Sequence, residues 1–310
     1  MLDDRATLHA RDRHGFLERL AALPEAYDGP DGVLPGPHGL DPGGAAAVLT
    51  PLLAEWFGGR HVGAGTQFLT RDGGSGGESA LAAPAAGGPR QVRVILGDSG
   101  DAEPVGHDAA QVVRVPGDAT YPYHLVRYLA FATGRADAGT RLATALRAVA
   151  EAADPERPTE RNPAKTLAWA LWQRVPLLVS GRLAAAAQPL VQQTFARVGK
   201  ALAIPSGPHG EIVAAAAFEG RHALGDDLVA LVLGRGGGET EIVEEVLATR
   251  VAQVERLVAG GGWLPPADAD PVVDGVVAWY AATWVAAYGA LLVELDPADD
   301  GVYGRLRAVA

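Results

Sequence analysis

The segment from Thr194 to Ile212 holds the side chains best suited to chemistry on an anionic substrate. Arg197 and Lys200 supply positive charge, and His209 and Glu211 follow in a stretch rich in Gly and Pro. A guanidinium stays protonated at any ordinary pH, so Arg197 can bind a phosphate or a carboxylate but cannot remove a proton. A histidine can transfer a proton near neutral pH, and a carboxylate can act as a base. Arg197 is therefore suited to bind an anion and not to act as a base.

Strands and helices alternate along both halves of the chain, as in parallel α/β sheets. Apolar runs between turn residues predict strands at 66–70, 91–96, 111–115, 175–180, 228–233 and 254–258. Helical spacing predicts helices at 5–23, 45–57, 77–86, 121–133, 138–153, 163–173, 183–202, 211–220 and 239–252, with two more near the C-terminus. Arg197 and Lys200 thus lie on a predicted helix, and His209 lies in the predicted loop after it.

The chain is longer than one typical domain, since it has 310 residues and 48% of them are hydrophobic. Pro and charged residues crowd the stretch 154–162, as they do in a linker. We therefore predict two α/β domains of similar size, at 1–153 and 154–310.

Composition and charge exclude several classes of function. A formal net charge of -11 disfavours nucleic acid as a partner, because phosphate backbones are bound by clustered Lys and Arg. The chain has no Cys, which excludes disulfides, thiolate catalysis and Cys-based zinc sites and fits a cytoplasmic location. The eight His residues show no metal-type spacing, so we expect neither a metal nor a cofactor.

The apolar run from Val272 to Leu295 is long enough to cross a bilayer, but it contains Asp274 and Glu294. Its Trp and Tyr residues recur at helical spacing, at positions 279, 280, 284 and 288. We therefore expect a buried helix in a core or at a dimer face, and no membrane span. The acidic residues at positions 3 and 4 argue against a signal peptide.

The segment that carries Arg197 resembles a stretch of the bacterial and archaeal phosphoglucose/phosphomannose isomerases. That family writes the stretch as L-N-E-N-A-K and then N-H-N-E-I, and this chain reads T-F-A-R-V-G-K and then P-H-G-E-I. Lys200 matches the family lysine, and His209 and Glu211 match the H-x-E. Arg197 stands at the position of the family's general base glutamate.

Two further patterns in the second half resemble the same family. Residues 162–165 read N-P-A-K, and residues 295–297 read L-D-P where the family has V-D-P. Arg307 falls at the position of the family's C-terminal lysine. The resemblance covers roughly residues 160–310. It implies that the whole chain is α/β and consists of two tandem sugar isomerase (SIS) domains, each an αβα sandwich with a parallel sheet flanked by helices.

The first half resembles the family in the positions of its loops along the chain and less in the residues themselves. Residues 36–44 fall at its first glycine loop, and residues 72–79 fall at its phosphate loop, which binds an anion through backbone N–H groups at a helix N-terminus. The expected phosphate-binding residues are Gly39, Ser75, Gly76, Gly77, Ser79 and Lys200. An ordinary strand-to-helix turn, capped by the serines, is the alternative interpretation of the second loop. Near Tyr121, Arg127 is the alternative to an arginine that the family uses to contact its substrate.

The resemblance implies isomerisation of glucose 6-phosphate or mannose 6-phosphate to fructose 6-phosphate through an enediol. A carboxylate is the natural base for this reaction, and a histidine helps to open the sugar ring. In the family this histidine comes from the neighbouring subunit, which implies a homodimer. A phosphorylated sugar is thus the expected partner, and the expected catalytic residues are His209, Arg197 and Arg307.

Arg197 leaves two interpretations open. In the first, the chain is an isomerase with a weakened or rearranged site, and Glu160, Glu211 or Glu219 replaces the base. In the second, it is a non-catalytic phosphosugar-binding sensor or regulator on a SIS scaffold. Glu211 also fits a first-turn acid of a helix, and His209 also fits a plain surface loop. The fold alone cannot separate the two functions.

Overall fold

The computed structural model describes residues 2–34, 37–41, 44–57, 66–72, 90–96, 111–208, 225–235, 240–299 and 301. The chain forms two compact units. The larger unit comprises Met1–Pro24 and Leu142–Asp299, and the smaller unit comprises Glu25–Arg141 and Asp300–Ala310. The division falls within helix α5 (Ala136–Ala152), and the Pro-rich stretch 154–162 belongs to the larger unit.

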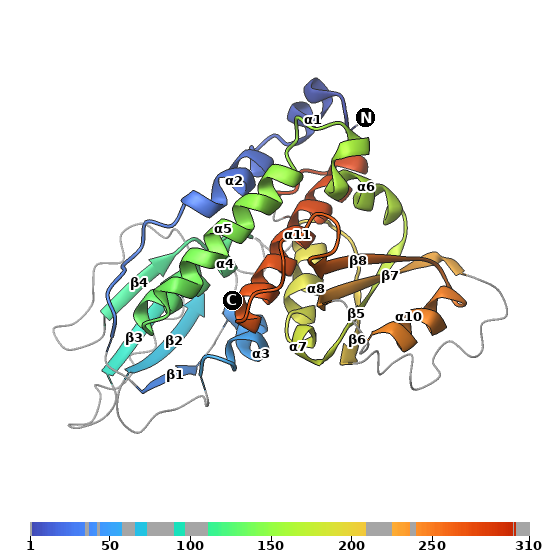
Figure 1. The fold of residues 1–310 in the computed structure, drawn as a ribbon. Coiled ribbons are helices and arrows are strands. Elements are labelled where there is room, and N and C mark those ends of the chain that lie inside the picture. Colours follow the sequence, from blue (N-terminus) through green and yellow to red (C-terminus); the bar gives the residue numbers. More distant parts are fainter. Residues whose placement is uncertain are drawn as a thin grey trace. The chain divides into compact units, whose positions relative to one another are not determined.

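A four-stranded parallel sheet forms the centre of the smaller unit (Figure 1). Its strands pair in chain order: β1 (His38–Asp41), β2 (Thr66–Asp72), β3 (Arg90–Leu96) and β4 (Gln111–Val115). Its helical segments are η2 (Gly44–Leu49), α3 (Thr50–Leu53), α4 (Tyr121–Ala132) and the first part of α5. Phe68, Val92 and Val94 are fully buried, so the sheet carries the core of this unit.

The larger unit has its own parallel sheet, in the order β6, β5, β7, β8. These strands are β6 (Ile204–Pro208), β5 (Val175–Ser180), β7 (Gly225–Arg235) and β8 (Val251–Ala259). The helices of this unit are α1 (Arg5–Arg11), α2 (Phe16–Ala22), α6 (Pro163–Ala170), α7 (Arg182–Ala185), α8 (Gln188–Arg197), α10 (Glu241–Ala248) and α11 (Pro271–Leu292). Short 3-10 turns lie at η1 (Leu23–Glu25) and η3 (Thr159–Arg161).

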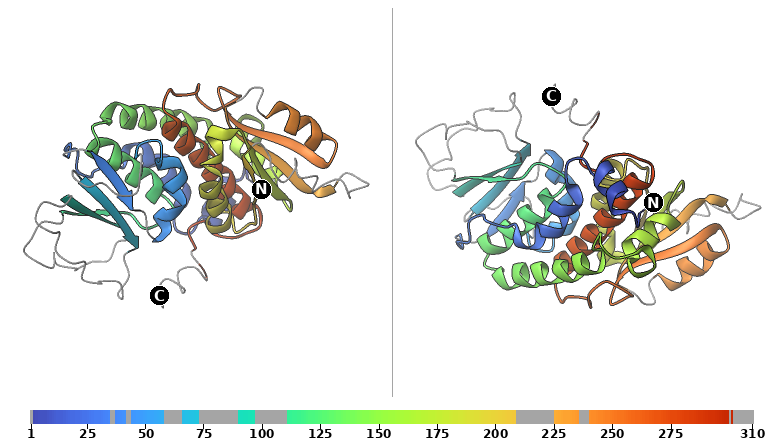
Figure 2. Two further views of the ribbon diagram at one scale, coloured as in Figure 1. Left: turned by 90° about the horizontal axis from the view of Figure 1, so that it is seen from below. Right: turned by 90° about the horizontal axis from the view of Figure 1, so that it is seen from above.

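Both faces of the β5–β7 sheet are buried. Successive side chains of a strand point to opposite faces, so Leu177 and Val179 share the face that packs with Leu247 of α10. Leu178 points to the other face, where α8 and α11 lie (Figure 2). A parallel sheet with helices on both faces is an αβα sandwich, which confirms the predicted fold class.

The six strands predicted from the sequence are all present, and β2, β3, β7 and β8 extend slightly beyond the predicted bounds. The helices predicted at 77–86 and 211–220 lie outside the described residues.

The helix α11 is buried along almost its whole length. It contacts α2, α6, α7, α8, β7 and β8. By length and composition this helix could cross a membrane, yet 94% of its apolar window is buried inside the protein. Trp279, Tyr280, Trp284 and Tyr288 are each at most 1% exposed, so the predicted aromatic positions form a core.

The helix predicted at 5–23 is instead two helices, α1 and α2. The carboxylate of Asp12 accepts hydrogen bonds from the backbone N–H groups of Phe16 at 2.6 Å and Leu17 at 2.9 Å. Gly15 adopts a left-handed φ of 61° at the break, a conformation that favours glycine. Apolar spacing continues across the break, so periodicity alone could not reveal it.

The helix predicted at 183–202 is also divided, into α7 and α8. Pro189 lies in the first turn of α8, where its missing N–H costs nothing, and it cannot continue a preceding helix. The predicted loop after α8 contains the strand β6. Pro205 and Pro208 concealed this strand, because proline argues against a central strand. The strand can nevertheless form, because proline is tolerated in edge strands and β6 lies at a sheet edge. Likewise, the glycine loop predicted at 36–44 contains β1.

The N-P-A-K stretch connects α5 to α6. The side-chain oxygen of Asn162 accepts a hydrogen bond from the N–H of Lys165 at 3.0 Å and caps α6. The Asn162 amide donates to the carbonyl oxygens of the two residues after α5, at 3.0 and 2.9 Å. The buried ammonium of Lys165 donates to the carbonyl oxygens of Pro155 at 2.9 Å and Arg157 at 2.7 Å. Both side chains thus fix the backbone of the segment between α5 and α6.

Replacing Asn162 should therefore destabilise the fold. We expect Asn162→Ala to lower the free energy of unfolding by about 2–4 kcal/mol, because it removes a helix cap and two buried hydrogen-bond donors. Asn162→Ser keeps an oxygen at the cap position and should lose less. Urea denaturation of the three proteins measures this, and a change of less than about 0.5 kcal/mol for the alanine variant would contradict the assigned role.

His124 of α4 is a buried titratable group, only 7% exposed. Burial lowers the pKa of its imidazole below the ordinary value of 6.5, and the charges of Asp118 and Asp28 partly oppose this shift. The unfolded chain consequently binds a proton at His124 at a higher pH than the folded chain does. Folding with a neutral His124 therefore costs nothing above the pKa of the unfolded chain. Below that pKa the protonated unfolded state is favoured, and the fold loses stability as the pH falls.

We expect wild-type protein to lose more stability between about pH 7.5 and about pH 5.5 than His124→Gln, which lacks this titration. Urea unfolding at both pH values gives the comparison. His9→Gln, at an exposed histidine, is the matched control and should keep the wild-type dependence. Equal losses in wild type and His124→Gln would refute the role of His124.

Candidate functional site

Ligands of parallel α/β sheets bind outside the carboxyl ends of the strands, where the chain connections diverge. In the larger unit these ends are Ser180 of β5, Pro208 of β6 and Arg235 of β7. The helices α7 and α8 follow β5, and α10 follows β7 on the opposite side of the sheet (Figure 2). From β5 the chain passes to β6 on one side and then to β7 on the other side of β5. A ligand is therefore expected beyond the carboxyl ends of these strands.

The buried amide of Gln188 organises this edge. It donates to Oγ of Ser180 at 2.6 Å and to the carbonyl of Gly207 at 3.2 Å, and it accepts from the N–H of Gly207 at 3.2 Å. The backbone of Gly207 is thus held through both of its polar groups, two residues before His209. Sequence reasoning missed Gln188, because a single Gln gives no signal; the adjacent Pro189 was the available sign of a helix start.

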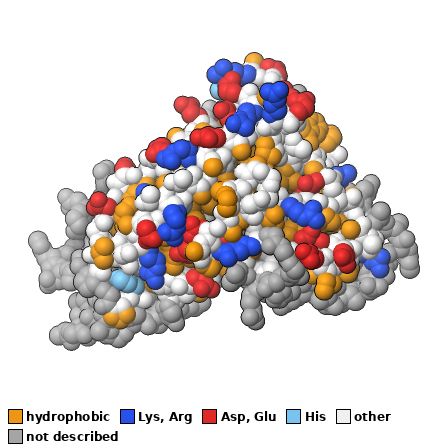
Figure 3. Space-filling model, viewed as in Figure 1, with side chains coloured by type: hydrophobic (Ala, Val, Ile, Leu, Met, Phe, Trp, Pro, Cys, Tyr) orange, Lys and Arg blue, Asp and Glu red, His pale blue; other side chains and the backbone are white. Residues whose placement is uncertain are grey.

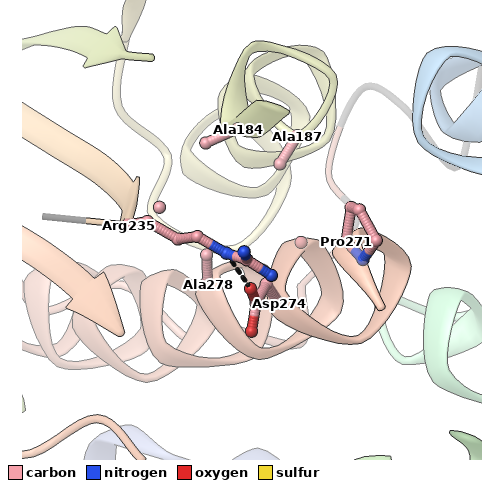
Figure 4. A pocket seen from close by; sticks show the side chains of 8 residues that line it. Ala184, Ala187, Arg235, Pro271, Asp274 and Ala278 are labelled. Atoms are coloured by element: carbon pink, nitrogen blue, oxygen red, sulfur yellow. Dashed lines mark hydrogen bonds and ion pairs between the residues drawn. The ribbon is translucent and has the colours of Figure 1, made fainter. Parts of the chain in front are cut away.

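A small cavity lies beyond the ends of β5 and β7 (Figure 4). Arg235 Nε donates to Oδ2 of Asp274 at 2.8 Å, and its Nη2 donates to the carbonyl of Asp268. A Cβ on Gly234 would lie 2.2 Å from that of Ala184, so the close approach of β7 to α7 requires glycine. The cavity of about 20 Å³ has room for about one water molecule. It cannot hold a sugar phosphate.

Two of the predicted site residues lie together at the C-terminal end of α8. Arg197 is the last residue of α8 and is only 9% exposed. Lys200 has a left-handed φ of 53°, and its ammonium donates to the carbonyl oxygens of Arg197, at 2.6 Å, and Asp299. Lys200 thereby satisfies a helix end, where partial negative charge gathers. Arg197 thus places a buried cation at this helix end.

The other predicted site residues are separate from this pair or lie outside the described residues. Gly39 is buried inside β1, opposite Gln67 of β2, so its backbone belongs to a sheet and not to a loop. Glu160, an alternative base, is exposed in η3. The residues outside the described ranges are His209, Arg307, Ser75, Gly76, Gly77, Ser79, Glu211 and Glu219.

Arg127, the alternative cation near Tyr121, is enclosed by aromatic rings in the smaller unit. Its guanidinium carbon lies 5.3 Å from the ring centre of Tyr27, 5.9 Å from that of Tyr123 and 5.1 Å from that of Phe131. Its Nη1 donates to the carbonyl of Gly139. Contacts of this kind contribute about 0.5–2 kcal/mol each to stability. Arg127 therefore has a structural role that ties α4 to α5.

Asp296 of the L-D-P stretch is 2% exposed. Its Oδ2 lies 2.7 Å from Nδ1 of His14, and its Oδ1 accepts from the N–H of Ala298 at 2.9 Å. This carboxylate connects the end of α11 to the N-terminal segment, and its role is structural. Within the described part of the chain, no three metal-ligating side chains form a cluster. Acidic and basic side chains are interspersed on the face seen in Figure 3.

Two family models match the chain in order. The phosphoglucose isomerase N-terminal domain matches residues 16–134, and the bacterial phospho-glucose isomerase C-terminal SIS domain matches residues 160–309. A crystal structure of a glucose-6-phosphate isomerase like protein from Thermus thermophilus is 32% identical, with a TM-score of 0.79. That match covers 100% of this chain and 99% of the other. No curated protein matches the chain.

More distant structures share the fold alone. Tagatose-6-phosphate ketose/aldose isomerase from Escherichia coli is 14% identical, with a TM-score of 0.50 and coverage of 95% of each chain. Glucosamine-6-phosphate deaminase from Thermotoga maritima is 7% identical, with a TM-score of 0.54 and coverage of 95% of this chain and 96% of the other. With both isomerase domain models in order and a 32% identical relative along its whole length, the chain belongs to the bacterial phosphoglucose isomerase family of SIS-domain, phosphosugar isomerase-like proteins.

Proposed function

We propose that this protein is an isomerase of hexose 6-phosphates, which interconverts glucose 6-phosphate or mannose 6-phosphate with fructose 6-phosphate. The observation that supports this most is the whole-chain likeness to a glucose-6-phosphate isomerase like protein, at 32% identity. The reaction moves one proton between the first two sugar carbons through an enediol. Oxidation at one carbon balances reduction at the other, so the chemistry needs no redox cofactor.

The reaction needs a base that removes a proton from carbon, and Arg197 cannot supply it. In the proposed isomerase the base is therefore a carboxylate at another position. Glu160, Glu211 and Glu219 are the candidates. His209 of the partner subunit opens the sugar ring in this proposal, which requires a homodimer.

One observation favours a second function, in which the protein binds a phosphosugar without converting it. The helix end that the family pattern gives to a lysine and a carboxylate carries two cations here, Arg197 and Lys200. Guanidinium and ammonium groups bind phosphate, and a sensor or regulator on a SIS scaffold requires no more than this. The two functions share a ligand and differ in turnover.

A coupled assay of fructose 6-phosphate conversion to glucose 6-phosphate and mannose 6-phosphate separates the two functions. We expect turnover by the wild type. Replacing the true base, among Glu160→Gln, Glu211→Gln and Glu219→Gln, should then lower kcat by about 100-fold or more. Calorimetric binding of fructose 6-phosphate without turnover would favour the second function instead.

Arg197→Glu tests the assigned position of the base. If the wild type is silent and this variant gains activity, the scaffold is an isomerase converted to binding. Ala196→Glu is the matched control, because it adds a carboxylate to the same helix at an exposed position one residue away. Activity in both variants would contradict the register in which Arg197 occupies the base position. Thermal melts of all variants identify any that fail to fold.

A further inference from the structure

A second cavity in the larger unit lies at the amino end of β5, away from the strand ends where a sugar is expected. Its volume is about 170 Å³. Engineered cavities of about 150 Å³ bind benzene, so this one can hold a single aromatic ring. Its lining comes from the C-terminal parts of α6, α8 and α11, and includes Trp172, Arg174, Phe195, Lys200, Gly289 and Val293.

The walls of this cavity are mainly apolar. Trp172, Phe195 and Val293 line it together with Leu171 and Val285. A sugar would bury its hydroxyl groups against these side chains without hydrogen-bond partners, which is costly. The body of a fitting ligand is therefore apolar.

The charged side chains in the lining are both cationic. Arg174 Nη1 donates to the carbonyl of Ala170 at 2.9 Å, and Lys200 Nζ donates to the carbonyl oxygens of Arg197 and Asp299. Among the described residues that line the cavity, none is acidic, in a chain whose formal net charge is -11. Glu294, the nearest acid in sequence, forms an ion pair with Arg11 at 2.6 Å. The cavity therefore favours a ligand with an anionic group.

Gly289 leaves this space open. It lies inside α11, where glycine is less favourable than alanine, and it lines the cavity. A Cβ at this position would meet nothing within 4 Å. A larger side chain here would therefore enter the cavity without displacing backbone.

Backbone strain gathers at the same place. The described residues other than glycine with a left-handed φ are Gln173 at 57°, Lys200 at 53° and Glu294 at 65°. Gln173 and Lys200 line the cavity, and Glu294 follows the lining residue Val293. Each one follows the last residue of a helix by two or three positions, where a left-handed residue is a common ending that costs some energy for a side chain other than glycine.

The opening is bordered by exposed aromatic surface. Trp172 is 41% exposed and packs edge-on against Trp169, which is 38% exposed, with ring centres 5.4 Å apart. Phe195 faces this cavity, and Arg197, two residues later, points about 160° away around the helix. The cavity is thus on the other side of α8 from Arg197.

We propose that this cavity is a binding site for a small aromatic carboxylate, separate from the sugar phosphate site. The ring lies between Trp172, Phe195 and the part of α11 where Gly289 has no side chain. The carboxylate lies beside Arg174. This inference goes beyond the proposed function and does not depend on turnover.

Calorimetry and ligand-detected NMR on the full chain, with benzoate, benzamide and benzylamine as probes, test the proposal. We expect benzoate to bind at least about tenfold more tightly than benzylamine, with benzamide between them. Binding of benzoate should quench Trp fluorescence. Equal affinity for the three probes, or no binding of any, would overturn the proposal.

Variants locate the site. Gly289→Leu should weaken benzoate binding about tenfold or more, because it fills the cavity, and Arg174→Gln should weaken benzoate binding while sparing benzamide. Gly32→Leu, at an exposed glycine with nothing within 4 Å of its Cβ position, is the matched control. Gly289→Ala, a smaller change, keeps the test valid if the leucine variant fails to fold.

Two outcomes would assign the cavity differently. Displacement of benzoate by fructose 6-phosphate would make this cavity the sugar phosphate site and overturn a separate ligand. A fall in oligomer mass for Gly289→Leu in sedimentation, with benzoate binding unchanged, would show that a second copy covers the surface. Loss of isomerase turnover alone bears on the proposed function and leaves this proposal intact.

Discussion

The burial of α11 is the constraint on which the larger unit depends. This helix is apolar around its whole circumference, so every side must be covered by protein. Helices cover it from several directions and the sheet covers it through β7 and β8. Its tyrosines also need partners: Tyr280 donates to the carbonyl of Leu20 at 2.5 Å, and Tyr288 donates to that of Ala153 at 2.7 Å. These bonds anchor the N-terminal segment and the end of α5 to the same core.

The two cavities described above both lie against this helix. The small cavity uses its first half, at Asp274 and Ala278, beyond the carboxyl ends of the strands. The larger cavity uses its second half, at Val285 and Gly289, near the amino end of β5. A single rigid helix thus forms a wall at each edge of the sheet.

The family resemblance rests largely on residues that stabilise the fold. Asn162 and Lys165 hold the backbone between α5 and α6, Asp296 holds the end of α11, and Lys200 holds the end of α8. Removing such a group leaves buried carbonyl or N–H groups without a partner, which is costly. A catalytic carboxylate has no such structural task. Residues of this kind can show the family without showing activity, so family membership and activity are separate questions.

The sequence by itself determined the fold class, six of the eight described strands and the buried nature of α11, because apolar runs and their period depend only on local chemistry. It also determined the family, through short patterns such as N-P-A-K. Helix breaks are set locally, by Asp12 and Gly15 between α1 and α2 and by Pro189 at the start of α8, but apolar periodicity does not reveal them. Tertiary structure alone recruited β6, because a proline-containing segment becomes a strand only when a neighbouring edge is available. Roles of polar side chains were decided in the same way: Arg127 faces aromatic rings and Gln188 clamps Gly207, and these partners are brought together only by folding.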